Sequence, residues 1–401
     1  MSVHPARRGP YLKKERMHPG DSGSFTYANP RSIYWGAGCL GPRLDQVLSE
    51  HGLRRAFVIT TRSVAAHPAL GKRLEAALAE RCVGQFSGIG QHAPVETVMA
   101  ATQAAAQARP DALISIGGGS PIDATKAVAF SLATGLDLSD PRAPRRARDL
   151  HPRADDLLPH VAIPTTLSAA EMSGLAGFST EAEREKVGLR DEVLIPTAVV
   201  FDAELALHTP LDLWLSTGIR AVDHAVETLL APDCHPLSDT LALEALRRLR
   251  VSLLATKAAP ADLSARTDSQ LGAWFSFTLP GPAAAGLSHT LGKRIGSRHG
   301  IPHGISSCLL LPHVMRYLAP SSAVSQARIA AALGIDSGAM SIERAASCAA
   351  DAVADLVGRL ELPQHLGAYG LSQADLEAAA RPVASQAYPF EDLVDIYRAA
   401  L

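Results

Sequence analysis

The pattern of apolar residues changes abruptly after His208-Thr209-Pro210, and this change limits the possible folds more than any other feature. Before it, short β-rich runs alternate with helical patterns, whereas long helical patterns follow it. Strands that alternate with helices indicate a mainly parallel sheet with helices on both faces. We therefore predict an α/β domain at residues 31–209 and an all-α domain at residues 210–401, preceded by a flexible basic tail at residues 1–30.

Individual elements follow from the same patterns. Short apolar runs predict buried strands at residues 56–60, 112–116, 161–163 and 198–201. The stretch at residues 140–159 has charges and turn residues but no apolar period, which predicts an exposed excursion. Helical patterns cover residues 69–80, 95–108, 213–230, 238–256, 262–278, 322–333, 341–360 and 372–380.

Composition excludes several classes of protein. A formal net charge of -2 gives no basic surface for nucleic acid, and no apolar run approaches the ~20 residues of a membrane-spanning helix. The basic N-terminal segment is not followed by the apolar run of a secretory signal. The five cysteines are far apart and form no CxxC pair, which argues against a disulfide framework. We expect a soluble, cytoplasmic protein.

The strongest local signal is GGGSPIDATK at residues 117–126, which directly follows a predicted strand and opens a helical pattern. Glycines let backbone amides approach a pyrophosphate, and a helix N-terminus attracts its negative charge. This pattern predicts a nucleotide phosphate site, although glycine-rich turns without a ligand are also common. Asp123 either bonds a polar ligand or complements the helix dipole.

A second turn, PTTLS at residues 164–168, also follows an apolar strand. Its hydroxyls either cap a helix or contact the phosphate and ribose of a cofactor. In an open α/β sheet, ligands bind beyond the carboxyl ends of the strands, so both turns should face one crevice. Together they reinforce the prediction of a phosphate site in a Rossmann-like domain.

The second half of the chain holds the candidate catalytic histidines. Arg220 and His224 are four residues apart in a helical pattern and share one face. His289 and His303 flank a glycine-rich stretch, LSHTLGKRIGSRHGIPHG, which we expect to be a loop. Each histidine is either a hydrogen-bonded structural residue or part of a site, and their grouping favours a site.

Four motifs in a fixed order, GGGSPIDATK, PTTLSAAE, LSTGIRAVDHAVE and IPHGISSCLLLPHV, resemble the iron-containing (group III) alcohol dehydrogenase superfamily, most closely its maleylacetate reductase branch. The similarity covers roughly residues 31–390. It implies a dehydroquinate synthase-like fold with an NAD(P)-binding α/β domain and an all-α domain. By matched position, the implied cofactor-binding residues are Gly117, Gly118, Gly119, Ser120, Asp123, Thr165, Thr166 and Lys186.

Thr61 stands where NAD-preferring members of the superfamily often carry aspartate. A carboxylate at this position would bond the ribose hydroxyls and repel a 2′-phosphate. Because Thr61 lacks that charge, we expect the site to accept NADPH.

The resemblance also raises the question of a metal. Metal-using members place an aspartate and a histidine four residues apart, and two later histidines complete the site. Here Arg220 takes the aspartate position, while His224, His289 and His303 remain. A guanidinium cannot ligate a cation and repels one, so we predict a metal-free site. If a metal binds, these three histidines would hold it.

Arg220 either clamps a substrate carboxylate or pairs with a neighbouring acid, Asp223 or Glu227. Lys293 replaces another histidine of the superfamily; it either protonates an alkoxide, binds a second carboxylate or lies solvated at the surface. The resemblance thus implies hydride transfer between NAD(P)H and a small polar carbonyl or alcohol, and a homodimer. His224, His289, His303 and Lys293 would polarise the carbonyl and supply the proton, with Arg220 orienting an acidic group.

Three other functions remain open at this point. An alcohol dehydrogenase that modifies a natural product or peptide would account for the unusual Arg220 and Lys293. A dehydroquinate synthase-like lyase would use its NAD only transiently. A nucleotide-binding protein without catalysis is the third alternative.

Overall fold

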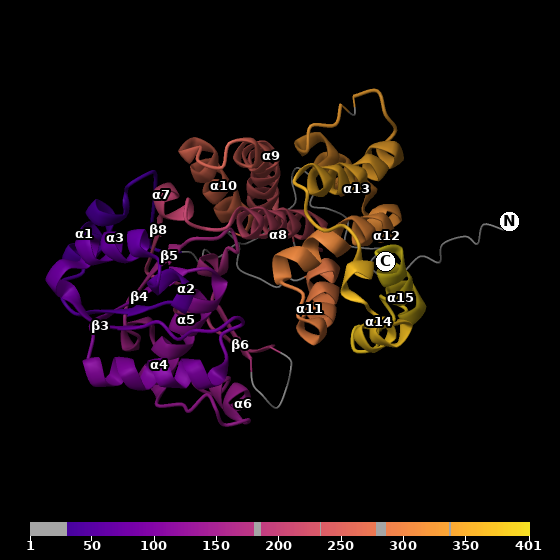
Figure 1. The fold of residues 1–401 in the computed structure, drawn as a ribbon. Coiled ribbons are helices and arrows are strands. Elements are labelled where there is room, and N and C mark those ends of the chain that lie inside the picture. The colour runs from indigo at the N-terminus through magenta and orange to yellow at the C-terminus, as the bar shows by residue number, and fades with distance from the viewer. Residues whose placement is uncertain (1–29, 180–185, 233, 278–285, 337) are drawn as a thin grey trace. The chain divides into compact units, whose positions relative to one another are not determined.

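The structure is a computed structural model, which describes residues 30–401 except 180–185, 233, 278–285 and 337 (Figure 1). The predicted tail at residues 1–30 therefore lies almost wholly outside the described residues. The chain forms two compact units. We call Tyr27–Trp214 with Ala255–Pro280 the sheet unit, and Leu215–Leu254 with Gly281–Leu401 the helical unit.

Six strands of the described sheet unit form one parallel sheet in the order β1-β8-β5-β4-β2-β3. The four predicted strands are confirmed as the four inner strands. The edge strands β1 and β3 were not predicted, because their half-exposed residues form no continuous apolar run. The strand bounds are β1 Ser32–Trp35, β2 Ala56–Ile59, β3 Cys82–Phe86, β4 Ala112–Gly117, β5 His160–Pro164 and β8 Ala198–Phe201. An antiparallel pair, β6 Leu175–Ser179 and β7 Lys186–Arg190, lies outside this sheet.

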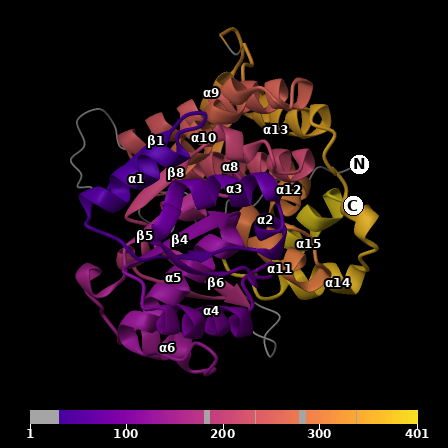
Figure 2. The ribbon, with the colours of Figure 1, turned by 60° about the vertical axis from the view of Figure 1, so that its left-hand side comes forward.

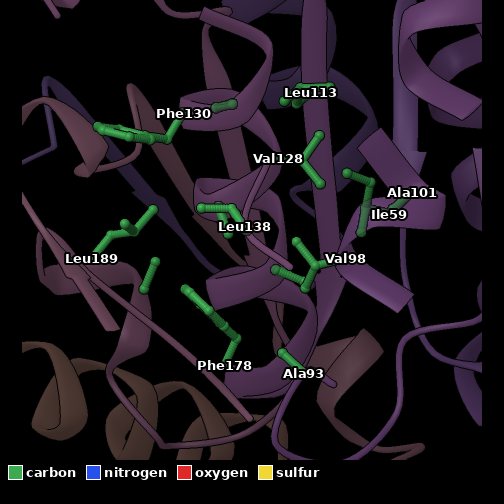
Figure 3. Close-up of a cluster of buried hydrophobic side chains, with 14 of the residues drawn as sticks. Ile59, Ala93, Val98, Ala101, Leu113, Val128, Phe130, Leu138, Phe178 and Leu189 are labelled. Atoms are coloured by element: carbon green, nitrogen blue, oxygen red, sulfur yellow. The ribbon is translucent and has the colours of Figure 1, made fainter. Parts of the chain in front are cut away.

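Helices cover both faces of the sheet, as predicted (Figure 2). Successive strand residues point to opposite faces, so Val58 packs with α1 and α3, whereas Phe57 packs with α4 and α5. The buried cluster on the second face joins Leu113 of β4 to Val98 of α4 and Val128 of α5 (Figure 3). The helix bounds in this unit are α1 Leu40–Glu50, α2 Arg62–Ala65, α3 Pro68–Leu78, α4 Val95–Ala108, α5 Gly119–Thr134, α6 Ala143–Ala147, α7 Ala203–Ala206 and α10 Leu263–Ser276.

The strand order places a topological switch point between β2 and β4. From β2 the chain runs to its neighbour β3 on one side, and then returns to β4 on the other side. Ligands of open α/β sheets bind beyond the carboxyl ends of the strands at such a point. Thr61 follows β2 and the glycine turn follows β4, so both lie at this edge.

The helical unit is built from long helices around an apolar core. Leu291 of α11, Leu310 of α12 and Tyr397 of α15 are completely buried within it. All predicted helices of the second half are present, whereas α11, the first half of α12 and α15 were not predicted. The bounds are α8 Leu211–Leu230, α9 Pro236–Ala258, α11 Leu287–His299, α12 His303–Ala332, α13 Ile342–Arg359, α14 Gln373–Ala380 and α15 Phe390–Ala399. The predicted helix at 322–333 is the second half of α12, which is kinked at Ser322.

The expectation of a glycine-rich loop at residues 287–304 was wrong. Most of that stretch is α11, and its glycines serve helix packing instead of flexibility. A Cβ added at Gly292 would lie 2.9 Å from Oγ of Ser306, and one at Gly296 would lie 2.9 Å from the carbonyl oxygen of Ile301. Gly300, at a φ of +67°, ends the helix in the left-handed conformation that favours glycine.

Candidate functional site

The glycine turn connects β4 directly to α5. Gly117 has a φ of +137°, which L side chains rarely adopt, and an added Cβ would lie 2.8 Å from Cγ of Pro121. Helix α5 follows with Gly118 as its N-cap, and no side chain caps it. Its first backbone N–H groups are thus not bonded by a capping side chain, which suits an anion such as a phosphate.

The second turn packs against the first. The backbone N–H of Thr165 donates to the carbonyl of Gly117 over 2.8 Å. A Cβ at Gly118 would lie 3.2 Å from Cγ2 of Thr166, and one at Gly119 would lie 3.3 Å from Oγ of Ser168. The two turns therefore lie side by side, and a Cβ at either glycine would fit only if its neighbour shifted.

The remaining cofactor candidates have contacts of their own. Oγ of Ser120 accepts a hydrogen bond from the N–H of His92 (3.0 Å), and Oδ2 of Asp123 accepts one from the N–H of Gly177 (3.2 Å). Thr61 is the N-cap of α2, and its hydroxyl accepts a hydrogen bond from the backbone N–H of Val64. Lys186 is the first residue of β7, and its side chain lies outside the described part.

Lys126, the last residue of the glycine motif, forms hydrogen bonds that the sequence pattern did not predict. Its ammonium is completely buried and donates to three carbonyls, those of Ala170 (2.6 Å), Ser173 (2.7 Å) and Leu175 (2.8 Å). All three carbonyls lie in the segment that follows the second turn. Lys126 therefore ties α5 to that segment, and burial lowers the pKa of its ammonium.

In the helical unit, four ionisable side chains form a buried cluster. Arg220, Asp223 and Glu227 come from α8, and His289 comes from α11. Asp223, Glu227 and His289 bring their donor atoms within 4.8 Å of one another, the one such group of three among the described residues. That group contains neither His224 nor His303.

Glu227 holds the start of α11. Its carboxylate accepts hydrogen bonds from the N–H groups of Gly286 (2.8 Å), Ser288 (2.6 Å) and His289 (3.2 Å). A Cβ at Gly286 would lie 2.7 Å from the Glu227 carboxylate, so glycine is required there. A carboxylate at a helix N-terminus is well placed against the helix dipole.

Asp223 is completely buried, and several polar groups surround its Oδ2 atom. It accepts hydrogen bonds from Oγ of Ser288 (2.9 Å) and Oγ of Ser307 (2.6 Å). Nη1 of Arg220 lies 3.9 Å from the same oxygen and donates to Oγ of Ser307 over 3.2 Å. Of the two readings of Arg220, the ion pair with Asp223 is thus present, but at long range.

His289 faces both acids with one ring nitrogen. Its Nδ1 lies 2.6 Å from Oε2 of Glu227 and 3.4 Å from Oδ2 of Asp223. Burial and Arg220 lower the pKa of this imidazole, but the two carboxylates outweigh them and raise it above its ordinary value. Both ring nitrogens are buried and neither forms a hydrogen bond of good geometry with a described residue, so Nδ1 meets the two acids as an ion-pair contact, whereas Nε2 has no polar partner there.

His224 stacks on the same imidazole, with ring centroids 4.8 Å apart and planes inclined by 31°. Burial, followed by the charges of His289 and Arg220, lowers the pKa of His224 well below its ordinary value. His224 is therefore neutral near pH 7, while its neighbour favours the protonated form.

The other two predicted residues lie near the cluster in sequence. Lys293 is exposed, four residues after His289 on α11. His303 is half-buried and is the first residue of α12. Sequence reasoning considered Asp223 and Glu227 as partners of Arg220, and it missed Ser288 and Ser307 altogether. The sequence signal that could have indicated the cluster was the carboxylate of Glu227, about one helical turn after the candidate His224.

Comparison with known families covers nearly the whole described chain. The model for iron-containing alcohol dehydrogenases matches residues 30–203, and the model for the C-terminal region of the Fe-containing alcohol dehydrogenase family matches residues 214–400. The chain belongs to the iron-containing alcohol dehydrogenase family. This confirms the resemblance predicted from the four motifs and the two-part fold that it implied. As a family member, the chain is an NAD(P)-dependent oxidoreductase.

Individual relatives point to one branch of the family. Maleylacetate reductase of Burkholderia cepacia is 31% identical over 360 residues, which are 90% of each chain. Maleylacetate reductase of Sphingobium indicum is 32% identical over 305 residues, or 76% of this chain and 78% of that one. The crystal structure of maleylacetate reductase from Agrobacterium tumefaciens has a TM-score of 0.77 at 27% identity and covers 95% of this chain and 99% of its own. No helix among the described residues is long and apolar enough to cross a membrane.

Proposed function

We propose that this family member reduces a small oxo-acid of the maleylacetate kind with NAD(P)H. The observation that carries the proposal is the state of Arg220. Its side chain is 16% exposed, and among the described residues only Nη1 has a hydrogen bond or an ion pair, with Ser307 and Asp223. A guanidinium has five N–H donors, so its remaining edge can hold a carboxylate bidentately. The maleylacetate reductase relatives support a substrate that carries such a group.

The glycine turn fits a dinucleotide because α5 has no side-chain cap and begins at Gly118 and Gly119, which are half-buried and carry no side chain. We assign pyrophosphate binding to the first turn and further cofactor contacts to the second turn and to Thr61. The full proposed set is Thr61, Gly117, Gly118, Gly119, Ser120, Asp123, Thr165, Thr166 and Lys186. The side chains of Ser120 and Asp123 would have to serve the cofactor in addition to their present backbone contacts.

The family name implies iron, but the cluster in the helical unit does not fit a divalent cation. Glu227 already accepts three N–H groups, and Oδ2 of Asp223 already accepts two hydroxyls. Arg220 adds a permanent positive charge 3.9 Å from Oδ2 of Asp223. His224 lies outside the group of described residues whose donor atoms approach one another, although its ring centroid is 4.8 Å from that of His289. We therefore propose a metal-free site.

When bound, NAD(P)H supplies the hydride. Arg220 orients the acidic group of the substrate, and Nε2 of His289 donates the proton that the reduced carbonyl oxygen requires. Neutral His224 packs against that imidazole and keeps its ring in place. We assign His303 and Lys293 supporting roles in polarising the carbonyl or binding a second carboxylate.

A substrate panel tests the proposal. Purified protein is assayed with NADPH and NADH against maleylacetate, and with NADP⁺ and NAD⁺ against secondary alcohols. We expect turnover of maleylacetate or a close oxo-acid, and a loss of at least about tenfold in kcat/KM in Arg220→Met. Oxidation of alcohols without reduction of any oxo-acid would refute it. Stoichiometric iron or zinc in protein purified without added metal would refute the metal-free site.

The boundary between the predicted domains near residues 209 and 210, the homodimer and the cytoplasmic location stay predictions. Light scattering of the purified chain measures its oligomeric state directly and so tests the homodimer.

A further inference from the structure

The two carboxylates of the buried cluster serve different groups. Glu227 is occupied by the N–H groups at the start of α11, in addition to its contact with His289. Asp223 accepts no backbone N–H among the described residues, and besides the two serines its polar neighbours are the guanidinium of Arg220 and the imidazole of His289. Asp223 is therefore the residue through which the two cationic side chains of the cluster interact.

One oxygen, Oδ2 of Asp223, lies 3.9 Å from Nη1 of Arg220 and 3.4 Å from Nδ1 of His289. At these separations in a buried site, an anion attracts each cation strongly. Attraction toward Asp223 draws Nη1 of Arg220 and Nδ1 of His289 inward. It leaves the other edge of the guanidinium and Nε2 of the imidazole directed away from the carboxylate.

Serine hydroxyls fix this arrangement. Ser307 donates to Asp223 and accepts from Arg220, so its single hydroxyl bridges the anion and the guanidinium. Ser288 donates to the same oxygen from the first turn of α11, next to His289. Each of the two serines thus connects Asp223 to the element that carries one of the cations.

We propose that Asp223 is a positioning residue that couples the carboxylate clamp, Arg220, to the proton donor, His289. Its charge holds the imidazole with Nε2 toward the reacting atoms, and it restrains the guanidinium by competing with the substrate carboxylate. The inference rests on the proposed function for the roles of the two cations. Asp223 itself touches neither substrate nor cofactor.

This arrangement predicts opposite changes in two measured quantities for Asp223→Asn. The amide keeps the shape but removes one of the two charges that orient His289, so kcat should fall by up to about a hundredfold, the scale of a positioned general acid. The competing anion is also removed from Arg220, so carboxylate affinity should rise on the order of threefold to tenfold. A residue that merely supported the fold would lower both kcat and affinity.

The assay pairs kinetics with binding of succinate, a dicarboxylate that cannot accept a hydride. Calorimetry measures its Kd in the presence of NADP⁺ for the wild type, Asp223→Asn and Ser307→Ala. Because Ser307→Ala keeps the charge and loses one bridge, it should shift both quantities in the same directions by a smaller factor. It also provides the test if Asp223→Asn does not fold. The matched control is Asp239→Asn, which removes an acid paired with Arg328 elsewhere in the helical unit and should leave kcat and Kd unchanged.

A spectroscopic readout separates this inference from the proposed function. In protein labelled with ¹⁵N-histidine, His289→Gln identifies the signals of His289, and the shifts of its two ring nitrogens should change in Asp223→Asn. Unchanged shifts, or a kcat and an affinity that fall together, would overturn the positioning role. If the wild type turns over no oxo-acid, or Arg220→Met binds succinate as the wild type does, the proposed function fails instead.

Discussion

Replacing Glu227 by alanine should destabilise the helical unit strongly. The substitution removes the acceptor of three backbone N–H groups, from Gly286, Ser288 and His289, at distances of 2.8, 2.6 and 3.2 Å. Each buried donor without a partner costs about 1–3 kcal/mol, and water entering the vacated space recovers part of this cost. Removing one member of a buried ion pair costs about 3–5 kcal/mol in other proteins, and we expect a loss of that size here.

At about 2–4 °C per kcal/mol for a unit of this size, the unfolding midpoint should fall by about 6–20 °C. Urea unfolding followed by circular dichroism measures the free energy, and thermal unfolding measures the midpoint. The control is Glu244→Ala, which removes exposed ion pairs with Arg247 and Arg248 on α9 and should cost less than about 1 kcal/mol. A Glu227→Ala protein as stable as this control would refute the capping argument.

Three further predictions concern the sheet unit. Gly118→Ala places a Cβ 3.2 Å from Thr166 and should raise the Kd for NADPH by about tenfold in a fluorescence titration, whereas Gly71→Ala, with open space around it, should not. Thr61→Asp should weaken NADPH binding at least about tenfold and spare NADH, because the new carboxylate repels the 2′-phosphate; equal losses for both would contradict this. Burial lowers the pKa of His160 to about 3, so the unfolded chain protonates first as the pH falls below 6.5, and stability declines between these values. In that range, urea unfolding of His160→Gln should show a pH slope smaller by about 1.4 kcal/mol per unit.

The fold was predictable wherever apolar residues form long or uninterrupted patterns. The inner strands β2, β4, β5 and β8 are buried on both faces, and their runs of consecutive apolar residues identified them. The edge strands and α11 were missed for physical reasons. An edge strand has one exposed side, so its apolar run is interrupted. The glycines of α11 suggested a loop because the neighbours that they pack against become known only from the folded chain.

The candidate site shows the same limit. Arg220 and His224 could be placed on one helical face because both belong to α8. The hydrogen bond between Asp223 and Ser307 joins residues 84 positions apart, and no local sequence pattern predicts such a bond. Sequence spacing therefore identified the residue types of the site, whereas their pairing and charge balance required the folded chain.

The three carbonyls around Lys126 have a consequence for protein engineering. The glycine motif itself is one continuous stretch, residues 117–126. The ammonium of its final residue, Lys126, donates to carbonyl oxygens that lie more than forty positions later in the chain. A graft of the motif into another scaffold would bury an ammonium without acceptors unless the recipient offers the same three oxygens, so donor and recipient must be matched at both places.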